Sequence, residues 1–212
     1  MPKRKRAPRG GLSRDRILEA ALEIADSQGL EALTVRRLAS AMGVSPMAIY
    51  GHFGNKSELV GGLLGRVIVA FEVTGHTAVE SRDWVVESFV RMRRALLAHP
   101  GVIPLLGTGS SVSVTSVKVM QAMVSQLERL GCSQAQAVAS FYAMLTFTIG
   151  SAHVAHGVEQ LLGAGALEVG STVFAELEPE IGGDLMALAP TIVEQGQEES
   201  FIRTLEMLCP QV

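Results

Sequence analysis

Residues 34–58 read TVRRLASAMGVSPMAIYGHFGNKSE and encode two short helices joined by a tight turn. Thr34 is a predicted N-cap, because its hydroxyl can accept a hydrogen bond from the first turn of a helix. Gly43 can adopt the left-handed backbone that ends a helix. Ser45 followed by Pro46 is typical of a cap and a first helical position. A helix, a glycine-containing turn and a second helix form the arrangement that places a recognition helix in the major groove of DNA.

The flanking residues complete a small helical head. Ser13 predicts the start of an amphipathic helix that ends before Gly29. Asn55 and Glu58 have the spacing of a capping box and predict one further helix. Three glycines in that helix each cost about 1 kcal/mol relative to alanine, so its first turns are expected to be soft. They are Gly61, Gly62 and Gly65.

The rest of the chain has helical periodicity and no convincing strand alternation, which predicts an all-α protein of about nine or ten helices. Beyond the head, helices are expected over residues 83–98, 115–130, 133–162 and 200–208, with a short helix broken at Pro104 and one or two more within 171–189. Loops are expected at GTGSSVSV and at LGAGALEVG.

Charge is distributed unevenly along the chain. The net charge of the 212 residues is only −3. Residues 1–66, however, contain 11 lysines and arginines against 6 acidic residues, whereas the remainder contains 7 against 15. A polyanionic partner is therefore expected to bind the N-terminal third.

Cysteine usage and hydropathy bear on the cellular location. Cys132 and Cys209 follow no disulfide or metal spacing, which fits the reducing cytoplasm. The basic start MPKRKRAPRGGLS has no apolar run, so no secretory signal is expected. Residues 130–158 carry no Lys, Arg, Asp or Glu and are long enough to cross a bilayer. Their many Ser, Thr, Gln and His residues instead favour a helix packed against protein, so no membrane partner is expected.

Several motifs resemble the TetR family of bacterial transcriptional regulators. LTVRRLASAMGVSPMAIYGHFGNKSEL is similar to the family's DNA-binding head, and the resemblance covers residues 13–60. DWVVESFVRMRRALLAHPGV and EESFIRTLEMLC are similar to the ligand-binding half of the tetracycline-repressor subgroup. The resemblance implies a homodimer without a cofactor. It would bind a palindromic operator in double-stranded DNA and release it when a small molecule enters the C-terminal domain.

The periodicity and the resemblance together predict four segments. They are a disordered basic arm (1–12), a helix-turn-helix DNA-binding domain (13–60), a connecting helix (61–80) and a ligand-binding and dimerisation domain (81–212).

The resemblance also implies which residues of the head contact DNA. Thr34, Arg36, Tyr50, His52 and Lys56 match positions at or near the phosphates, and residues 45–48 match the base-facing start of the recognition helix. The expected DNA-binding set is Thr34, Arg36, Ser45, Pro46, Met47, Ala48, Tyr50, His52 and Lys56.

The chemistry of this set agrees with those positions. Cations neutralise phosphates, and hydroxyls and helix N-termini donate to them. Tyr50 could instead be a core aromatic, and His52 and Lys56 could be solvated side chains. Pro46-Met47-Ala48 offers few donors, so base reading is expected to use apolar contact to thymine methyls and close backbone approach at Ser45 or Gly51.

An apolar, adaptable effector pocket is expected in the C-terminal half. Its candidate residues, many of which could equally be ordinary core, are Met92, Leu105, Leu106, Met120, Met123, Phe141, Met144 and Phe147. Tetracycline-binding members use a histidine where this chain has Leu105, so tetracycline is not an expected effector. His153 and His156 share a helical face but lack a third ligand, so no metal site is expected.

Two functions of different classes remain. The first is a ligand-responsive repressor that pairs through residues 133–162 and the final helix, because interface cores are poor in charge. Its basic arm, residues 1–12, could reach a minor groove or be an unused tail. The second is an enzyme or small-molecule carrier with an attached DNA-binding head. The chain has no G-x-S-x-G elbow, phosphate loop or metal quartet, which argues against an enzyme, although a dispersed catalytic site would leave no such motif.

Overall fold

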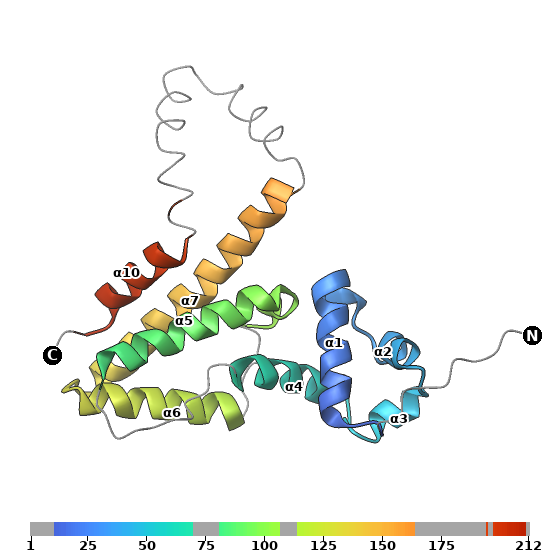
Figure 1. Ribbon diagram of the computed structural model, residues 1–212. Helices are drawn as coiled ribbons and strands as arrows, with labels where there is room; N and C mark the ends of the chain where they lie inside the picture. Colours follow the sequence, from blue (N-terminus) through green and yellow to red (C-terminus); the bar gives the residue numbers. More distant parts are fainter. Residues whose placement is uncertain (1–10, 70–80, 107–113, 164–193, 195–196, 211–212) are drawn as a thin grey trace, which may run out of the picture. The chain divides into compact units, whose positions relative to one another are not determined.

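The computed structural model describes residues 11–69, 81–106, 114–163, 194 and 197–210. In these ranges every regular element is a helix, which confirms the all-α prediction (Figure 1). The chain forms two compact units, which are described separately below. The first comprises Met1–Glu72 with Ala98–Val119, and the second comprises Val73–Leu97 with Met120–Val212.

The first unit contains the helix-turn-helix motif. Its elements are α1 (Arg14–Gln28), the 3-10 helix η1 (Leu30–Ala32), α2 (Val35–Met42), α3 (Pro46–Tyr50), α4 (Lys56–Val69) and the 3-10 helix η2 (Pro100–Leu105). Ser13 caps α1 as predicted by accepting a hydrogen bond from the Arg16 N–H. The apolar stripe of α1, including Ile17 and Ala21, is fully buried and packs against α2 and α4.

One glycine of α4 has a packing role that was not predicted from the sequence. A Cβ atom on Gly62 would lie 2.9 Å from Cδ2 of Leu18 on α1 and 3.3 Å from Cε1 of Phe53. Gly62 therefore permits a close approach between α4 and α1. Gly61 and Gly65 have no atom within 4 Å of such a Cβ, so alanine would fit at either position and would favour the helix.

The segment that follows α5 packs on the side of α1. The backbone at Gly101 comes so close that an added Cβ would lie 2.3 Å from the carbonyl carbon of Ala25. Asp26 anchors this contact: its carboxylate accepts from the Gly101 N–H at 3.0 Å and lies 2.9 Å from Nδ1 of His99. The short helix broken at Pro104 was predicted, whereas its docking on the head was not.

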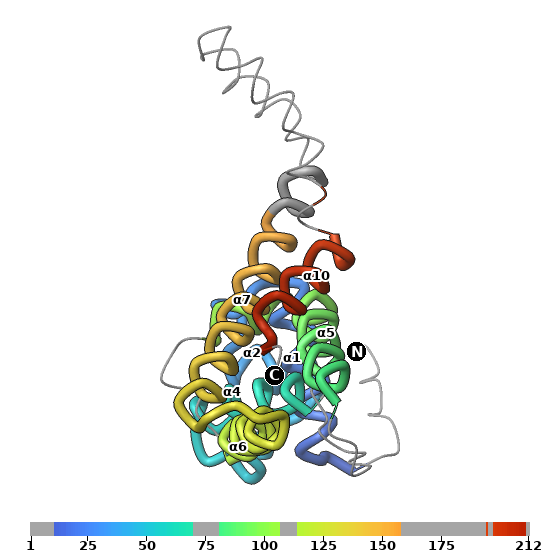
Figure 2. Tube along the Cα trace, turned by 90° about the vertical axis from the view of Figure 1, so that its left-hand side faces the viewer, coloured from blue at the N-terminus to red at the C-terminus, as the bar shows by residue number. Residues whose placement is uncertain are grey.

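The second unit is built from long helices. Its elements are most of α5 (Arg82–Ala98), the C-terminal part of α6 (Val114–Arg129), α7 (Gln134–Gly163) and α10 (Glu198–Leu208). Figure 2 shows α7 and α10 side by side. Phe147 on α7 stacks on Phe201 of α10 with ring centroids 5.3 Å apart, and Phe89 on α5 lies 6.2 Å from Phe141 on α7.

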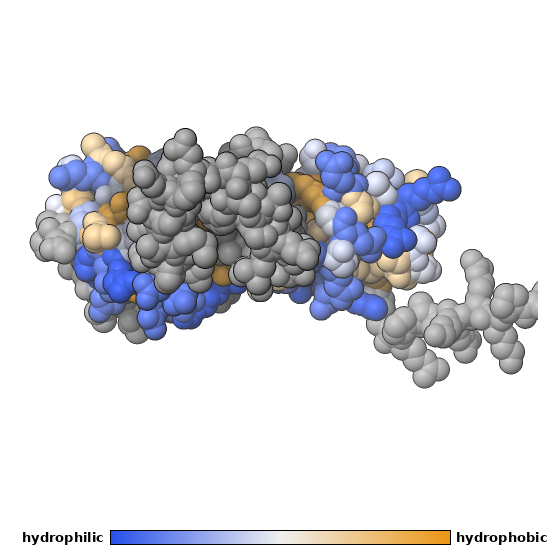
Figure 3. Space-filling view, turned by 90° about the horizontal axis from the view of Figure 1, so that it is seen from above, coloured by the Kyte–Doolittle hydropathy of each residue, from blue (hydrophilic) through white to orange (hydrophobic). Residues whose placement is uncertain are grey.

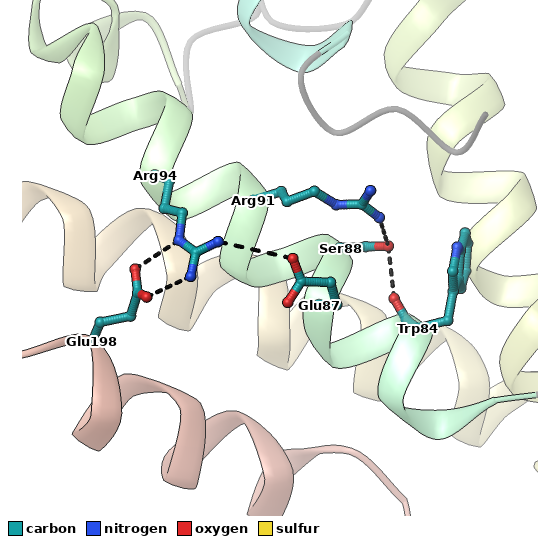
Figure 4. A network of polar contacts seen from close by, with 6 residues as sticks. All are labelled: Trp84, Glu87, Ser88, Arg91, Arg94 and Glu198. Carbon is teal, nitrogen blue, oxygen red and sulfur yellow. Dashed lines mark hydrogen bonds and ion pairs between the residues drawn. The ribbon is translucent and has the colours of Figure 1, made fainter. Parts of the chain in front are cut away.

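Polar contacts join α5 to α10 (Figure 4). Arg94 on α5 donates to both carboxylate oxygens of Glu198 on α10, at 2.9 and 2.6 Å. This hydrogen bond, reinforced by the nearby charges, raises the pKa of Arg94 and lowers that of Glu198. Arg82 at the start of α5 donates to the backbone carbonyls of Glu206 and Cys209.

Both thiols are buried, as ordinary core cysteines would be. Burial raises the pKa of Cys209, although the nearby Arg82 partly opposes this shift. Residues 134–157 of α7 are long and apolar enough to cross a membrane, with a mean hydropathy of 1.3. That is weak evidence for a membrane span, because the core helix of a water-soluble protein passes the same test.

Several sequence expectations lie outside the described residues. They concern residues 1–10 of the basic arm, the end of the connecting helix beyond Val69, the loop at 107–113 and the short helices within 171–189.

Candidate DNA-binding site

The turn between α2 and α3 has the geometry that the sequence predicts. The Thr34 hydroxyl accepts from the Arg37 N–H at 3.1 Å and caps α2. Gly43 ends α2 at φ 68°, in the left-handed region that favours glycine. The Ser45 hydroxyl then accepts from the Ala48 N–H at 3.2 Å, with Pro46 in the first turn of α3. These caps fix the direction in which the short α3 leaves the turn.

The outer face of α3 is exposed, and it is apolar. Met47 exposes 75% of its surface and Tyr50 exposes 45%, while Ile49 on the opposite side is buried. Ser45 and Pro46 are also exposed, and Ala48 is half-buried. The exposure of Tyr50 rules out the alternative that it is a core aromatic.

Donor groups belong to the elements on both sides of α3. Thr34 and Arg36 on the α2 side and Lys56 at the start of α4 are exposed, and His52 is half-buried. Arg37 is exposed, and its guanidinium donates to Oε1 of Gln28 at 3.0 Å. Figure 3 shows the side of the head that is uppermost in Figure 1, at the right, where hydrophilic and apolar residues are mixed.

An arginine far away in the sequence supports the turn between α3 and α4. Arg14 on α1 donates to the His52 carbonyl and, at 2.8 Å, to Oε1 of Glu58, and its guanidinium lies 4.1 Å from the centre of the Phe53 ring. The other Glu58 oxygen accepts from the Gly54 N–H at 2.7 Å, so the capping box closes one residue earlier than predicted. Asn55 caps α4 as expected, accepting from the Glu58 N–H at 2.8 Å.

The Arg14–Glu58 pair makes a pH-dependent contribution with a definite sign. The hydrogen bond from Arg14, with a further one from the Gly54 N–H, lowers the pKa of Glu58 below its ordinary 4.5. A depressed carboxyl pKa stabilises the fold above the unfolded-state value, and this contribution is lost as the pH falls through the folded value. The contribution is therefore constant near neutral pH.

Glu58→Gln is expected to lower the free energy of unfolding by an amount that is the same from pH 8 to 5 and shrinks only below about pH 4.5. The loss should be small, because both partners are about half exposed. Urea denaturation at several pH values measures it. The control is Glu19→Gln, an exposed α1 position without a described partner. A loss that varies between pH 8 and 6 would contradict the assignment.

In the second unit, most of the predicted effector residues lie in the core. Met92, Met123, Phe141 and Met144 are buried, and Met120 and Phe147 are half-buried. The Tyr142 hydroxyl lies 4.0 Å from Sδ of Met120, which links α7 to α6. Leu105 and Leu106 belong to the first compact unit, where Leu105 is buried.

A buried cation lies among these helices and was not predicted. Arg93 on α5 is only 3% exposed, and its Nε donates to the Ser151 hydroxyl on α7 at 2.9 Å. Its guanidinium lies 5.0 Å from the centre of the Phe201 ring. Burial lowers the pKa of Arg93, and the Glu198 charge partly opposes that shift. The buried face of α5 thus contains the charged Arg93 among apolar residues, which the sequence pattern alone did not predict.

No three metal-ligating side chains come together in the part of the chain that the structure describes. His153 is exposed and His156 is half-buried.

A capped helix-turn-helix followed by a long-helix unit defines a class of protein: helical transcriptional regulators that bind DNA through their N-terminal head. Two family models agree with this class. Residues 17–63 match the bacterial regulatory proteins of the tetR family, and residues 82–209 match the tetracyclin repressor-like C-terminal domain. The chain therefore belongs to the TetR family of transcriptional regulators, with a DNA-binding and a ligand-binding domain.

Several known proteins align over most of the chain. It is similar to the tetracycline repressor protein class C of Escherichia coli, at 28% identity over 93% of this chain and 89% of that one. The structure is similar to that of ActR from Streptomyces coelicolor in complex with (S)-DNPA, with 25% identity, a TM-score of 0.65 and coverage of 92% and 98%. It also resembles BioQ with its natural double-stranded DNA operator, with 26% identity, a TM-score of 0.60 and coverage of 76% and 98%.

Proposed function

We propose that this protein is a cytoplasmic repressor that binds a palindromic operator in double-stranded DNA as a homodimer. A small apolar effector would release it. The observation that carries the proposal is the exposed face of α3 between two sets of donors. Met47 and Tyr50 project from a rigidly capped helix, and Arg36 and Lys56 lie on either side of it in the chain. Such a surface can neutralise phosphates on both edges of a major groove while α3 enters it.

The dimer contact is assigned to α7 and α10. Residues 134–157 of α7 contain no charged side chain, yet Tyr142 and Val154 are more than half exposed, as is Met207 on α10. Apolar surface without charge is typical of interface cores. The α7 helix also packs on α5 and α10 through aromatic contacts, which supports a second protein chain rather than lipid as the partner.

Pairing through these helices would give the DNA two heads related by a two-fold axis. The two α3 helices would enter successive major grooves about 34 Å apart, which predicts an operator that is an inverted repeat.

The operator and the dimer can be tested together. Selection of duplexes from a random library is expected to enrich an inverted repeat with half-sites about one helical turn apart. Light scattering is expected to show two chains per protein particle at micromolar concentration, and two chains on each selected duplex. A monomer at that concentration would contradict the proposed dimer, and the absence of any enriched sequence would contradict the proposed DNA-binding function.

The effector is assigned to the methionine- and phenylalanine-rich interior of the second unit. Met92, Met123 and Met144 are flexible side chains that can repack around an apolar molecule. Release needs the effector to prefer the non-binding conformation by only a few kcal/mol. A shift of α4 would transmit that preference to the head, because Gly61 and Gly65 leave this helix intrinsically soft.

Tetracycline with Mg²⁺ is expected to leave operator binding unchanged. Leu105 offers neither a nitrogen nor an oxygen to a chelated metal, and a buried leucine cannot replace a ligating histidine. Fluorescence anisotropy of a labelled operator, with tetracycline at about 100 μM and Mg²⁺ at about 5 mM, measures this, because about 100 μM nearly fills a site with a Kd of about 1 μM. A tetracycline-dependent release would contradict the apolar assignment, and the class C repressor of Escherichia coli serves as the positive control.

A further inference from the structure

The recognition helix and the residues that follow it, up to Phe53, lack the charged and amide side chains that read bases through bidentate hydrogen bonds. Residues 45–53 read SPMAIYGHF, with no Arg, Lys, Asn, Gln, Asp or Glu. Guanine is usually read by Arg or Lys, adenine by Asn or Gln, and cytosine by Asp or Glu. None of these bidentate pairings is available from this face.

A highly exposed side chain of this helix is instead apolar. Met47 is the most exposed large hydrophobic residue of the described range 11–69. Its backbone is held on one side by the Ser45 cap and Pro46, and on the other by the buried Ile49. Tyr50 lies three residues later and shares its helical face. Because 75% of its surface is exposed in the free head, this methionine is available to contact DNA.

The major groove offers one apolar group on the base edges, the 5-methyl group of thymine. The position of Met47 relative to the phosphate donors favours contact with this methyl group. Tyr50 lies on the same short helix, and Lys56 begins the next one. A DNA backbone held by these two donors would bring Met47 to the base edges rather than to the phosphates.

We propose that Met47 is the specificity-determining residue of the head, and that it reads a thymine by packing against its 5-methyl group in each operator half-site. This inference rests on the proposed function and names the base chemistry of that site. The hydrogen-bonding edge of the same base pair contributes little at this position, because Met47 has no donor.

Replacing thymine by deoxyuridine removes only the methyl group and tests the inference directly. Each thymine of a selected operator is replaced in both half-sites at once, and Kd is measured by fluorescence anisotropy at fixed salt. Burial of one methyl group corresponds to about a four-fold change in affinity, so one symmetric replacement should weaken binding about 15-fold. The other replacements should change Kd less than two-fold.

The same series with Met47→Ala assigns the effect to this side chain. The variant should fold normally, because Met47 is exposed, and circular dichroism checks this. In Met47→Ala the sensitive thymine should lose its sensitivity to deoxyuridine. The control variant Val69→Ala, an exposed apolar change on α4, should retain the full 15-fold effect.

The outcomes separate the inference from the function beneath it. No selected duplex at all would overturn the proposed function and the inference with it. A bound operator without a methyl-sensitive thymine, or one whose sensitivity persists in Met47→Ala, would overturn the inference alone.

Discussion

Replacing both Arg36 and Lys56 with alanine is expected to weaken operator binding about a thousandfold at physiological salt. Each cation that neutralises a phosphate releases about 0.9 counterion from duplex DNA. Two such contacts in each head make four in the dimer, and at about 0.15 M salt each contact accounts for roughly a five-fold gain in affinity. Both side chains are exposed, so their loss should not disturb the fold.

The matched control for this variant is Arg37→Ala. It removes the same charge from an adjacent position of α2, but the Arg37 guanidinium donates to Gln28, and Arg37 is not in the expected DNA-binding set. Fluorescence anisotropy should find its Kd within a few-fold of the wild type. Equal losses from Arg37→Ala and from either single replacement would mean that only the total charge of the head matters, which would contradict the assigned contacts.

Among the described glycines of the first unit, Gly101 is expected to show the largest loss of stability when it is replaced by alanine. The new Cβ would lie 2.3 Å from the Ala25 carbonyl carbon and 2.7 Å from the Asp26 nitrogen. These are backbone atoms of α1, so relief requires η2 to move away and to weaken the hydrogen bond from the Gly101 N–H to Asp26. Overpacking of this kind costs about 1–3 kcal/mol, which urea denaturation can measure.

Gly65→Ala is the matched control, because it adds the same methyl group to a helix of the same unit without a neighbour within 4 Å. It is expected to increase the free energy of unfolding by up to about 1 kcal/mol, since alanine is the better helix former. If Gly101→Ala were as stable as the wild type, the close approach of η2 to α1 would be wrong.

The helix caps of the head could be predicted from the sequence because they depend on neighbouring residues. Ser13, Thr34, Gly43 and Ser45 each act on a backbone group within a few positions, and each has the predicted role.

The contacts that position the head come from residues far apart in sequence, and no local pattern reveals them. Arg14 and Glu58 are 44 residues apart, and Asp26 and Gly101 are 75 apart. The role of Gly62 depends likewise on Leu18 of another helix. The sequence alone therefore predicted only that this glycine weakens its own helix. The buried Arg93 was missed for a related reason: its partner Ser151 is 58 residues away.

The salt dependence of operator binding tests the central claim most directly. The four assigned cations of the dimer, Arg36 and Lys56 from each chain, predict that log K falls with log salt concentration with a slope of about −3.6 or steeper. Anisotropy titrations of the wild-type protein on its selected operator, from about 50 to 300 mM salt, measure this slope. A slope near zero would contradict a head that binds DNA through these phosphates.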